Sequence, residues 1–368
     1  MKNYLLIILL IFTHKNGISQ VIEAIDAQKK QENSITKIQF ELIYEKVKRL
    51  PNQAQVSIAI IENGKVNFYG IKRIKDSILT INNYTDVFEI GSITKVFTAT
   101  LLSNFIIDRQ VELKGNINNY LDFYLKDSIE ISFEQLATHT SGLPRVPESL
   151  SSPSLSLENP YKDYGEEKLR NYLINKLKLS NKPGIKCDYS NLGFGLLGYS
   201  LSVIDNTTYE KLLQTKIFSK YQMKNSTTNR NKIEDRLIKG LNDIGKVVPN
   251  WDLSAHMGAG GILSTAQDLS KFAIAQFDSS NKELELTRTN FFKVSDNYSM
   301  GLAWGLVKSE SGAEWHWHNG GTGGYTSSMI INTKTKNGVI ILSNISVLGE
   351  LTSNIASLSP ELMKTIEK

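Results

Sequence analysis

Two Asn-Gly pairs near opposite ends of the chain constrain its fold more than any other feature. Each pair lies between short apolar runs of the β type, which is the strongest local signal for a β-hairpin. The pairs are Asn63-Gly64, between 55–61 and 66–69, and Asn337-Gly338, between 327–331 and 339–342. We therefore expect one antiparallel β-sheet that is assembled from the two ends of the chain.

The rest of the sequence reads mostly as helix. Apolar residues recur at helical spacing in seven segments: 35–50, 92–107, 165–179, 190–204, 208–220, 265–277 and 350–366. The pattern predicts an α/β fold of the α+β type, in which an antiparallel sheet flanked by helices comes from about 35–88 and 290–368. A mostly helical lobe from about 89–289 would complete the cleft. The Ser- and Pro-rich stretch 149–160 is expected to be a surface loop at the rim of that cleft.

The first nineteen residues are typical of an export signal. Lys2 precedes an apolar run over 4–12, and a polar stretch with small residues follows it up to Ser19. The run is too short to cross a bilayer as a helix. We expect cleavage near Ser19, which would leave a periplasmic or secreted protein of residues 20–368 with a single catalytic domain and no membrane span. The alternatives are a membrane anchor and a buried helix.

Charge and cysteine content exclude several classes of protein. The formal net charge is +5, and it falls to +3 when Lys2 and Lys15 are removed with the signal. Basic residues are spread along the chain without a nucleic-acid-binding motif, so no nucleic-acid partner is expected. Cys187 is the only cysteine, which excludes an internal disulfide, and we expect it to be a small buried residue.

A Ser-x-x-Lys arrangement on a helix places an amine beside a hydroxyl, where it can remove the hydroxyl proton. The arrangement occurs three times, at Ser34/Lys37, Ser92/Lys95 and Ser279/Lys282. The first and third lie in polar segments, the third in an expected loop. Only Ser92 follows a strand-like run and opens a helix that is apolar nearly all round. Burial there would lower the pKa of Lys95 toward a value suited to base catalysis. The alternative is that Ser92 merely caps the helix.

Tyr189 and Asn191 form a second candidate element. They follow a Pro-Gly turn and precede the glycine-rich segment 193–198, which could pack closely against a neighbouring helix. A nearby Lys95 ammonium would stabilise the Tyr189 phenolate, which would make this side chain a proton relay. Asn191 is expected to hydrogen-bond either Lys95 or a substrate amide.

The third candidate element is His318-Asn319-Gly320-Gly321, at the end of a strand-like run. Glycines there would let a substrate approach the backbone, and an exposed N–H, together with that of Ser92, would form an oxyanion hole. His316 and His318 share one strand face, so a metal site is the alternative. No carboxylate cluster accompanies these histidines, and we expect no metal.

In this order, Ser92/Lys95, Tyr189/Asn191 and His318-Asn319-Gly320 resemble the motifs of class C β-lactamase-like serine hydrolases, which include penicillin-binding-protein relatives, D-amino-acid peptidases and esterases. Further segments that resemble this family are 138–144, 260–269 and 298–305, so the resemblance runs from about residue 40 to 345. It implies a β-lactamase/transpeptidase-like fold that needs no cofactor. It also implies that Ser92 attacks a carbonyl, that Lys95 and Tyr189 exchange its proton, and that the N–H groups of Ser92 and Gly321 hold the oxyanion.

One position departs from the family pattern. His318 stands where class C β-lactamases carry the lysine of Lys-Thr-Gly, and a neutral imidazole is a weaker partner for an anion. The histidine form resembles the peptidase and esterase branches of the family, which implies a small D-amino peptide, amide or ester as substrate, with a β-lactam kept as an alternative that would be hydrolysed inefficiently. Two alternatives remain: a penicillin-binding sensor domain that acylates without turnover, and a Ser/His/Asp hydrolase that uses His139 or His318, although no G-x-S-x-G motif is present. The sequence indicates no oligomeric state.

Overall fold

The structure is a computed structural model that describes residues 35–151 and 158–367. The predicted export signal lies outside the described residues, as do positions 152–157 of the expected surface loop. None of the helices within the described ranges is long and apolar enough to cross a membrane.

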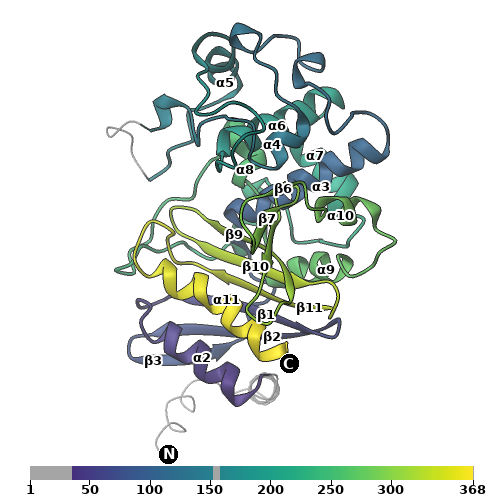
Figure 1. Cartoon of the computed structure of the whole chain (residues 1–368). Helices are drawn as coiled ribbons and strands as arrows, with labels where there is room; N and C mark the ends of the chain where they lie inside the picture. Colours follow the sequence, from purple (N-terminus) through teal and green to yellow (C-terminus); the bar gives the residue numbers. More distant parts are fainter. Residues whose placement is uncertain (1–34, 152–157, 368) are drawn as a thin grey trace, which may run out of the picture.

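One large antiparallel sheet of nine strands dominates the fold (Figure 1). In spatial order its strands are β3 (Ser77–Ile81), β2 (Lys65–Ile74), β1 (Gln55–Glu62), β11 (Asn337–Ser343), β10 (Thr326–Asn332), β9 (Glu314–Gly321), β8 (Gly305–Lys308), β7 (Tyr298–Met300) and β6 (Phe292–Lys293). The two ends of the chain meet in the middle of the sheet, where β1 pairs with β11. The prediction of one antiparallel sheet built from both ends is confirmed.

The two predicted hairpins differ in their turns. Asn63 and Gly64 form the β1–β2 turn, with φ of +51° and +78°. Asn337 instead pairs with Asn332 as the first residue of β11, so the second turn consists of the four residues 333–336. The Asn337 amide donates to the carbonyl of Ile366 at 2.9 Å. This asparagine therefore fastens the C-terminal helix to the sheet, and the expectation that it forms the turn is wrong.

Ten helices among the described residues surround or extend this sheet. They are α2 (Lys37–Val47), α3 (Thr94–Ile107), α4 (Phe133–Ala137), α5 (Glu166–Asn171), α6 (Asn191–Ile204), α7 (Tyr209–Leu213), α8 (Met257–Gly260), α9 (Ala266–Ala275), α10 (Lys282–Thr287) and α11 (Thr352–Ile366). The predicted segments 165–179 and 208–220 start as α5 and α7 and continue as wider π-type turns, at Tyr172–Lys176 and Gln214–Phe218.

Both faces of the central strands are buried. Along β1, Ile58 and Ile60 belong to a core shared with α2 and α11, whereas Ala59 and Ile61 belong to the larger core around α3 and α6. The alternation follows from the two-residue period of a strand, and each fully buried isoleucine stabilises the fold by about 1.5–3 kcal/mol. The helices α2 and α11 lie side by side over one face (Figure 1).

The helix α9 lies on the opposite face, where it contacts β1 and β11. The sequence-based division placed this segment in the helical lobe, whereas its contacts show that it packs on the sheet. The helix can do so because it is amphipathic: Leu269, Phe272 and Ala273 are buried, whereas Lys271 on the other side pairs with Asp268.

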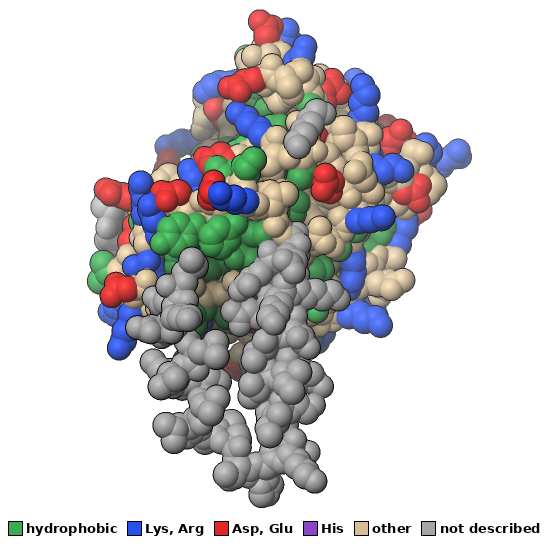
Figure 2. Space-filling model, turned by 90° about the horizontal axis from the view of Figure 1, so that it is seen from below, with side chains coloured by type: hydrophobic (Ala, Val, Ile, Leu, Met, Phe, Trp, Pro, Cys, Tyr) green, Lys and Arg blue, Asp and Glu red, His purple; other side chains and the backbone are tan. Residues whose placement is uncertain are grey.

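One end of the molecule carries an apolar surface. The helix α2 exposes Ile38, Phe40 and Tyr44, and the view of this end shows apolar side chains gathered among charged ones (Figure 2).

The Thr36 and Gln39 side chains close a capping box at the start of α2, which fixes the first turn of the helix.

Candidate active site

Ser92 lies in a sharp turn between a strand and the central helix. The short strand β4 (Phe88–Glu89) pairs with β5 (Leu263–Ser264), and Gly91 then turns the chain with φ of +49°. Ser92 belongs to a 3-10 turn over Gly91–Ile93, and the α-helix proper begins at Thr94. Its neighbours Gly91 and Ile93 are buried, whereas Ser92 is partly exposed. The turn therefore presents its hydroxyl at the surface of a cavity.

Lys95 lies one turn further along and is completely buried. Its Nζ is 3.0 Å from Ser92 Oγ, 2.8 Å from Asn191 Oδ1 and 2.7 Å from the carbonyl oxygen of Ala259. The amide oxygen and the carbonyl oxygen can only accept hydrogen bonds. A neutral amine has two N–H donors for these two oxygens and one lone pair, which is then left facing the Ser92 hydroxyl.

The surroundings of Lys95 favour this neutral amine. Burial lowers the pKa of Lys95 well below that of a free lysine, and the positive charge of Arg145 lowers the pKa further. No carboxylate in the described part of the chain forms an ion pair with Lys95. Removal from water without a counter-ion is the strongest cause of a lowered lysine pKa.

Asn191 is the first residue of α6, and its side chain connects Lys95 to Tyr161. Its side-chain oxygen accepts from Lys95, while its Nδ2 donates to the Tyr161 hydroxyl at 3.2 Å. The Ser190 side chain caps the helix by accepting from the N–H of Gly193. The expected contact between Asn191 and Lys95 is therefore present.

Tyr189 lies over the same lysine. The Lys95 Nζ is 4.7 Å from the centre of the Tyr189 ring, and the Ser92 side chain is near enough to the phenol to act on its pKa. Burial raises the pKa of Tyr189 above its usual value, and this effect outweighs the lowering caused by Ser92 and Arg145. The expected stabilisation of a phenolate is wrong for the free protein, because a neutral Lys95 supplies no charge. Tyr189 is a neutral phenol that contacts both Ser92 and the Lys95 amine.

The end of β9 comes against the Ser92 turn. Ser327 of β10 donates to the carbonyl of Ile90 at 2.8 Å, which fastens the sheet to the turn. A Cβ atom on Gly320 would collide with that same carbonyl and lie 2.9 Å from Ser92 N. Only glycine permits this approach. Gly321 and Ser92 consequently line one small cavity, as an oxyanion hole built from their N–H groups requires.

His318 and Asn319 point in different directions. His318 is buried, its Nδ1 lies 2.7 Å from the carbonyl oxygen of Asn319, and burial lowers its pKa to about 3. Asn319 is exposed and pairs across the sheet with Ser328, which faces α11. Strand alternation therefore places the Asn319 side chain on the face opposite to Ser92. Its predicted role as a substrate-binding side chain is not consistent with this position.

The alternatives from the sequence obtain little support from the described residues. Ser279 lies in a turn, and Lys282 is exposed and pairs with Glu285; Ser34 lies outside the described residues. No group of three or more His, Cys, Asp and Glu side chains in the described ranges could hold a metal ion. Cys187 is partly exposed rather than buried, and its thiol has a raised pKa.

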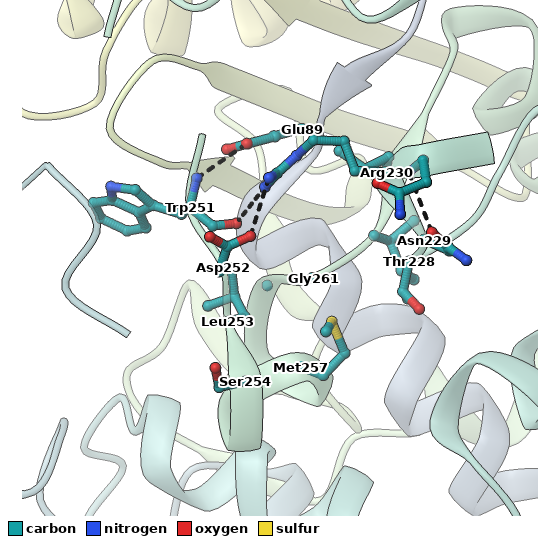
Figure 3. A pocket seen from close by; sticks show the side chains of 14 residues that line it. Glu89, Thr228, Asn229, Arg230, Trp251, Asp252, Leu253, Ser254, Met257 and Gly261 are labelled. Atoms are coloured by element: carbon teal, nitrogen blue, oxygen red, sulfur yellow. Dashed lines mark hydrogen bonds and ion pairs between the residues drawn. The ribbon is translucent and has the colours of Figure 1, made fainter. Parts of the chain in front are cut away.

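A larger cavity of about 420 Å³, whose lining side chains are drawn in Figure 3, adjoins the small cavity at Ser92. The two cavities share Trp251, Leu253 and Gly260 in their walls. On the far side, Arg230 pairs with Asp252 at 3.0 Å and donates to the carbonyl of Trp251. The cleft at Ser92 therefore opens into a space that is large enough for the remainder of a small peptide or acyl group.

Two further groups contact the site in roles that the sequence does not predict. The Ala259 carbonyl accepts from Lys95, and a backbone atom cannot be recognised from residue type. His139 stacks on Tyr189 with ring centres 4.3 Å apart and accepts from the N–H of Ser190. This histidine has a strongly lowered pKa because it is buried, so it supports the ring of Tyr189 as a neutral side chain.

The position of the Ala259 carbonyl depends on a close helix contact. A Cβ atom on Gly258 would lie 2.6 Å from the Phe194 carbonyl and 3.0 Å from Gly198 Cα. We expect Gly258→Ala to lower the free energy of unfolding by about 1–3 kcal/mol through overpacking and to reduce activity by moving Ala259. Urea unfolding measures the first effect. Gly165→Ala, at a position with open space for a Cβ atom, is the matched control, and equal stability of both variants would contradict the expectation.

A nine-stranded antiparallel sheet with a Ser-Lys-Tyr cluster at the start of a buried helix defines the class of β-lactamase and penicillin-binding serine hydrolases. The chain belongs to the Beta-lactamase family, whose family model matches residues 45–356. The predicted family and fold class are thereby confirmed, and the family supports a serine hydrolase in the broad sense.

Curated relatives are similar to this chain at 27–28% identity over the aligned residues. "Beta-lactamase-like protein 4" of Dictyostelium discoideum is 28% identical over 81% of this chain and 51% of its own length, so the chain spans about half of that relative. A "Beta-lactamase" of Pseudomonas fluorescens is 28% identical over 68% of this chain and 69% of its own length. The D-alanyl-D-alanine-carboxypeptidase/endopeptidase AmpH of Escherichia coli is 27% identical over 50% of this chain and 48% of its own length.

Solved structures share the fold. A β-lactamase/D-alanine carboxypeptidase from Yersinia pestis has a TM-score of 0.73 at 22% identity and covers 89% of this chain and 96% of its own. An octameric penicillin-binding protein homologue from Pyrococcus abyssi has a TM-score of 0.71 at 24% identity, covering 90% of this chain and 78% of its own.

Proposed function

We propose that the protein is an exported serine hydrolase that acts through an acyl-enzyme on a small amide or ester. The observation that carries this proposal is the geometry at Lys95. Its buried amine donates its two protons to two acceptor oxygens, and the nitrogen lone pair then faces Ser92 Oγ, which is 3.0 Å from Nζ. A lysine that only supported the fold would have no need of a hydroxyl beside its lone pair.

In the proposed acylation step, the neutral Lys95 amine takes the Ser92 proton while Ser92 Oγ attacks the substrate carbonyl carbon. The carbonyl π electrons move to oxygen, and the N–H groups of Ser92 and Gly321 stabilise the oxyanion. When the tetrahedral intermediate collapses, the bond to the leaving group breaks. Lys95 returns the proton to the leaving nitrogen or oxygen through the Tyr189 hydroxyl, which leaves the amine neutral again.

Deacylation reverses these roles. A water molecule attacks the ester carbonyl on Ser92 and gives its proton to Lys95 through Tyr189, so that Ser92 Oγ is released as the leaving group and is protonated. The proposed cycle uses only side-chain and backbone groups of the chain and no cofactor. Asn191 keeps the amine in position throughout, because its oxygen remains hydrogen-bonded to Lys95.

The substrate is proposed to be a D-amino peptide, a simple amide or an ester in preference to a β-lactam. The support is His318, which is buried and neutral where the related β-lactamases carry a lysine. The relative named a D-alanyl-D-alanine-carboxypeptidase/endopeptidase is consistent with a D-amino peptide, whereas the relatives named β-lactamase keep a β-lactam as the alternative substrate. We further propose export with cleavage near Ser19 and a single catalytic domain over 20–368, as the sequence predicts.

A substrate panel tests the proposal. Purified protein is offered phenyl and nitrophenyl esters of short acids, D-alanyl anilides, N-acetyl-D-alanyl-D-alanine and nitrocefin, and its intact mass is followed during turnover. We expect hydrolysis of esters or D-amino substrates and a transient acyl adduct on the protein. An adduct that persists for hours without turnover would instead show a penicillin-binding sensor domain. The absence of both turnover and adduct would refute the hydrolase.

A further inference from the structure

Three aromatic side chains line the small cavity at Ser92. They are Tyr161, Trp251 and His256. The Tyr161 ring lies between the other two, and its centre is 5.6 Å from the ring centre of Trp251 and 5.1 Å from that of His256. The Tyr161 hydroxyl also accepts from the Asn191 side chain at 3.2 Å. The row of rings is therefore connected to the residue that holds Lys95.

His256 carries hydrogen-bonding groups that the fold does not use. The side chain is completely buried, and neither of its ring nitrogens has a hydrogen-bond partner among the described residues. Burial lowers the pKa of His256 to about 3, so the ring is neutral and offers one N–H donor and one acceptor nitrogen. A buried polar group without a partner destabilises a protein, which makes a role in binding the simplest explanation for this side chain.

The position of His256 is fixed relative to Lys95. A Cβ atom on Gly195 of α6 would lie 3.2 Å from His256 Cα and 3.3 Å from its Cδ2, so the helix packs closely against the histidine. The Tyr164 ring contacts the imidazole with ring centres 5.2 Å apart. His256 directly precedes α8, whose Ala259 carbonyl accepts from Lys95. The imidazole is consequently held on the same short element that orients the candidate base.

Trp251 adds a second unused donor to this cavity. Its Nε1 is shielded from solvent and has no hydrogen-bond partner within the part of the chain that the structure describes. A Cβ atom on Gly323 would lie 2.5 Å from Nε1, so the glycine leaves space beside the indole N–H. The backbone of Trp251 is held by Glu89 and Arg230, and Figure 3 shows the indole turned away from the Arg230 side chain.

The size and the polar groups of the cavity select a small uncharged hydroxyl group. The cavity has a volume of about 20 Å³, which is room for about one group of the size of a water molecule. A hydroxyl can donate to the acceptor nitrogen of His256 and accept from the N–H of Trp251. An ammonium group can only donate, so it would leave the indole N–H unpaired. A hydrocarbon group would leave both side chains unpaired, and sites of this kind reject such analogues.

We propose that His256 and Trp251 bind a hydroxyl group on the acyl part of the substrate, and that the preferred substrates are esters or amides of small 2-hydroxy acids. The inference rests on the proposed function and names the acyl group that the site accepts. In the acyl-enzyme, the carbon next to the scissile carbonyl is two bonds from Ser92 Oγ, so its substituent enters the cavity that Ser92 lines. The adjoining cavity of about 420 Å³ takes the remainder of a larger acyl group.

Two esters that differ in one hydroxyl group test the assignment. Phenyl lactate, as each enantiomer, is compared with phenyl propionate in the wild type, His256→Phe and Trp251→Phe. The measured quantity is the ratio of kcat/KM for the better lactate ester to kcat/KM for the propionate ester. Comparing this ratio between proteins cancels the different intrinsic reactivity of the two esters. We expect each substitution to lower the ratio about 5- to 100-fold, the range for a buried group left unpaired, and to leave the propionate ester within about three-fold.

The chain offers matched controls for both substitutions. Trp304 Nε1 and His316 Nδ1 are likewise shielded from solvent and without a hydrogen-bond partner in the described ranges, but neither side chain lines the two cavities. Trp304→Phe and His316→Phe should therefore leave the ratio unchanged. His256→Gln keeps one donor and one acceptor group and should restore part of the preference. If His256→Phe does not fold, Trp251→Phe carries the test, because Trp251 is partly exposed.

Each outcome separates this inference from the proposed function. Equal losses for lactate and propionate esters would show that the two side chains only support the fold of the site. A ratio that stays unchanged in both variants would show that they do not contact the hydroxyl group; either result overturns the assignment. If the wild type hydrolyses phenyl acetate but neither lactate ester, the hydrolase stands and the hydroxyl site falls. If it hydrolyses no ester and no peptide, both fall.

Discussion

Ser92→Ala is expected to lower turnover of every accepted substrate by about 10⁴- to 10⁶-fold, as loss of a nucleophile does in other serine hydrolases. The reason is that the covalent route disappears, while Lys95, Tyr189 and the Ser92 N–H remain in place. Initial rates on the best ester or peptide measure the effect. Intact-mass analysis after exposure to a fluorophosphonate and, separately, to a penicillin should show an added mass on the wild type and none on the variant.

The chain provides its own control for this substitution. Ser279→Ala makes the same change in a second Ser-x-x-Lys arrangement, which lies in an exposed turn, and it should leave both labelling and turnover unchanged. If Ser92→Ala were still labelled or still active, the nucleophile would be another residue, and the Ser/His/Asp alternative with His139 would need to be tested next.

Lys95→Met is expected to slow acylation by about 10²- to 10⁴-fold, the usual contribution of a positioned general base. The variant should remain folded. Most substitutions of a buried residue lower the free energy of unfolding, but this one should not lower it at neutral pH. The physical reason is linkage. The pKa of Lys95 is lower in the folded chain than in the unfolded chain, so the unfolded state binds more protons and burial of the lysine costs stability below its unfolded pKa.

The same lowered pKa predicts the pH dependence of the wild type. In the proposed mechanism the neutral amine activates Ser92, so kcat/KM should fall as the pH drops through the folded-state pKa of Lys95, which lies well below 10.5. Single-turnover acylation across pH measures this acid limb. His318, with a pKa of about 3, remains neutral over the range. An acid limb centred near pH 10, or a Lys95→Met variant as fast as the exposed control Lys282→Met, would contradict the assignment.

The sequence predicts the architecture well where short-range patterns decide the structure. The Asn63-Gly64 turn, the buried helix after Ser92 and the helix predicted over 190–204 all follow from local residue choice. The prediction of the second turn is wrong because a contact with a distant segment determines the role of Asn337. Its side chain binds the end of α11, and four other residues form the turn. Likewise, the place of α9 on the sheet depends on partners that its own sequence does not specify.

The candidate site is predicted in its side chains but not in its backbone or its charges. Ser92, Lys95 and Asn191 come together as expected because one helix turn and one capped helix start bring them into contact. The neutral state of Tyr189 could not be predicted, since it depends on how deeply its ring is buried. The Ala259 carbonyl and the Arg145 guanidinium reach the site through contacts between segments that are far apart in the sequence.

The pairing of β1 with β11 has a consequence for how the molecule acquires its activity. Gln55 and Asn344 hydrogen-bond although 289 positions separate them, so β1 can pair early with β2 but has no partner on its other edge until almost the entire polypeptide is available. Such a long loop makes folding slow. The β9 glycines close against the Ser92 turn from this same late half of the sheet. A nascent chain would therefore carry an incomplete candidate oxyanion hole, and the proposed hydrolytic activity would appear only with the final, global folding event.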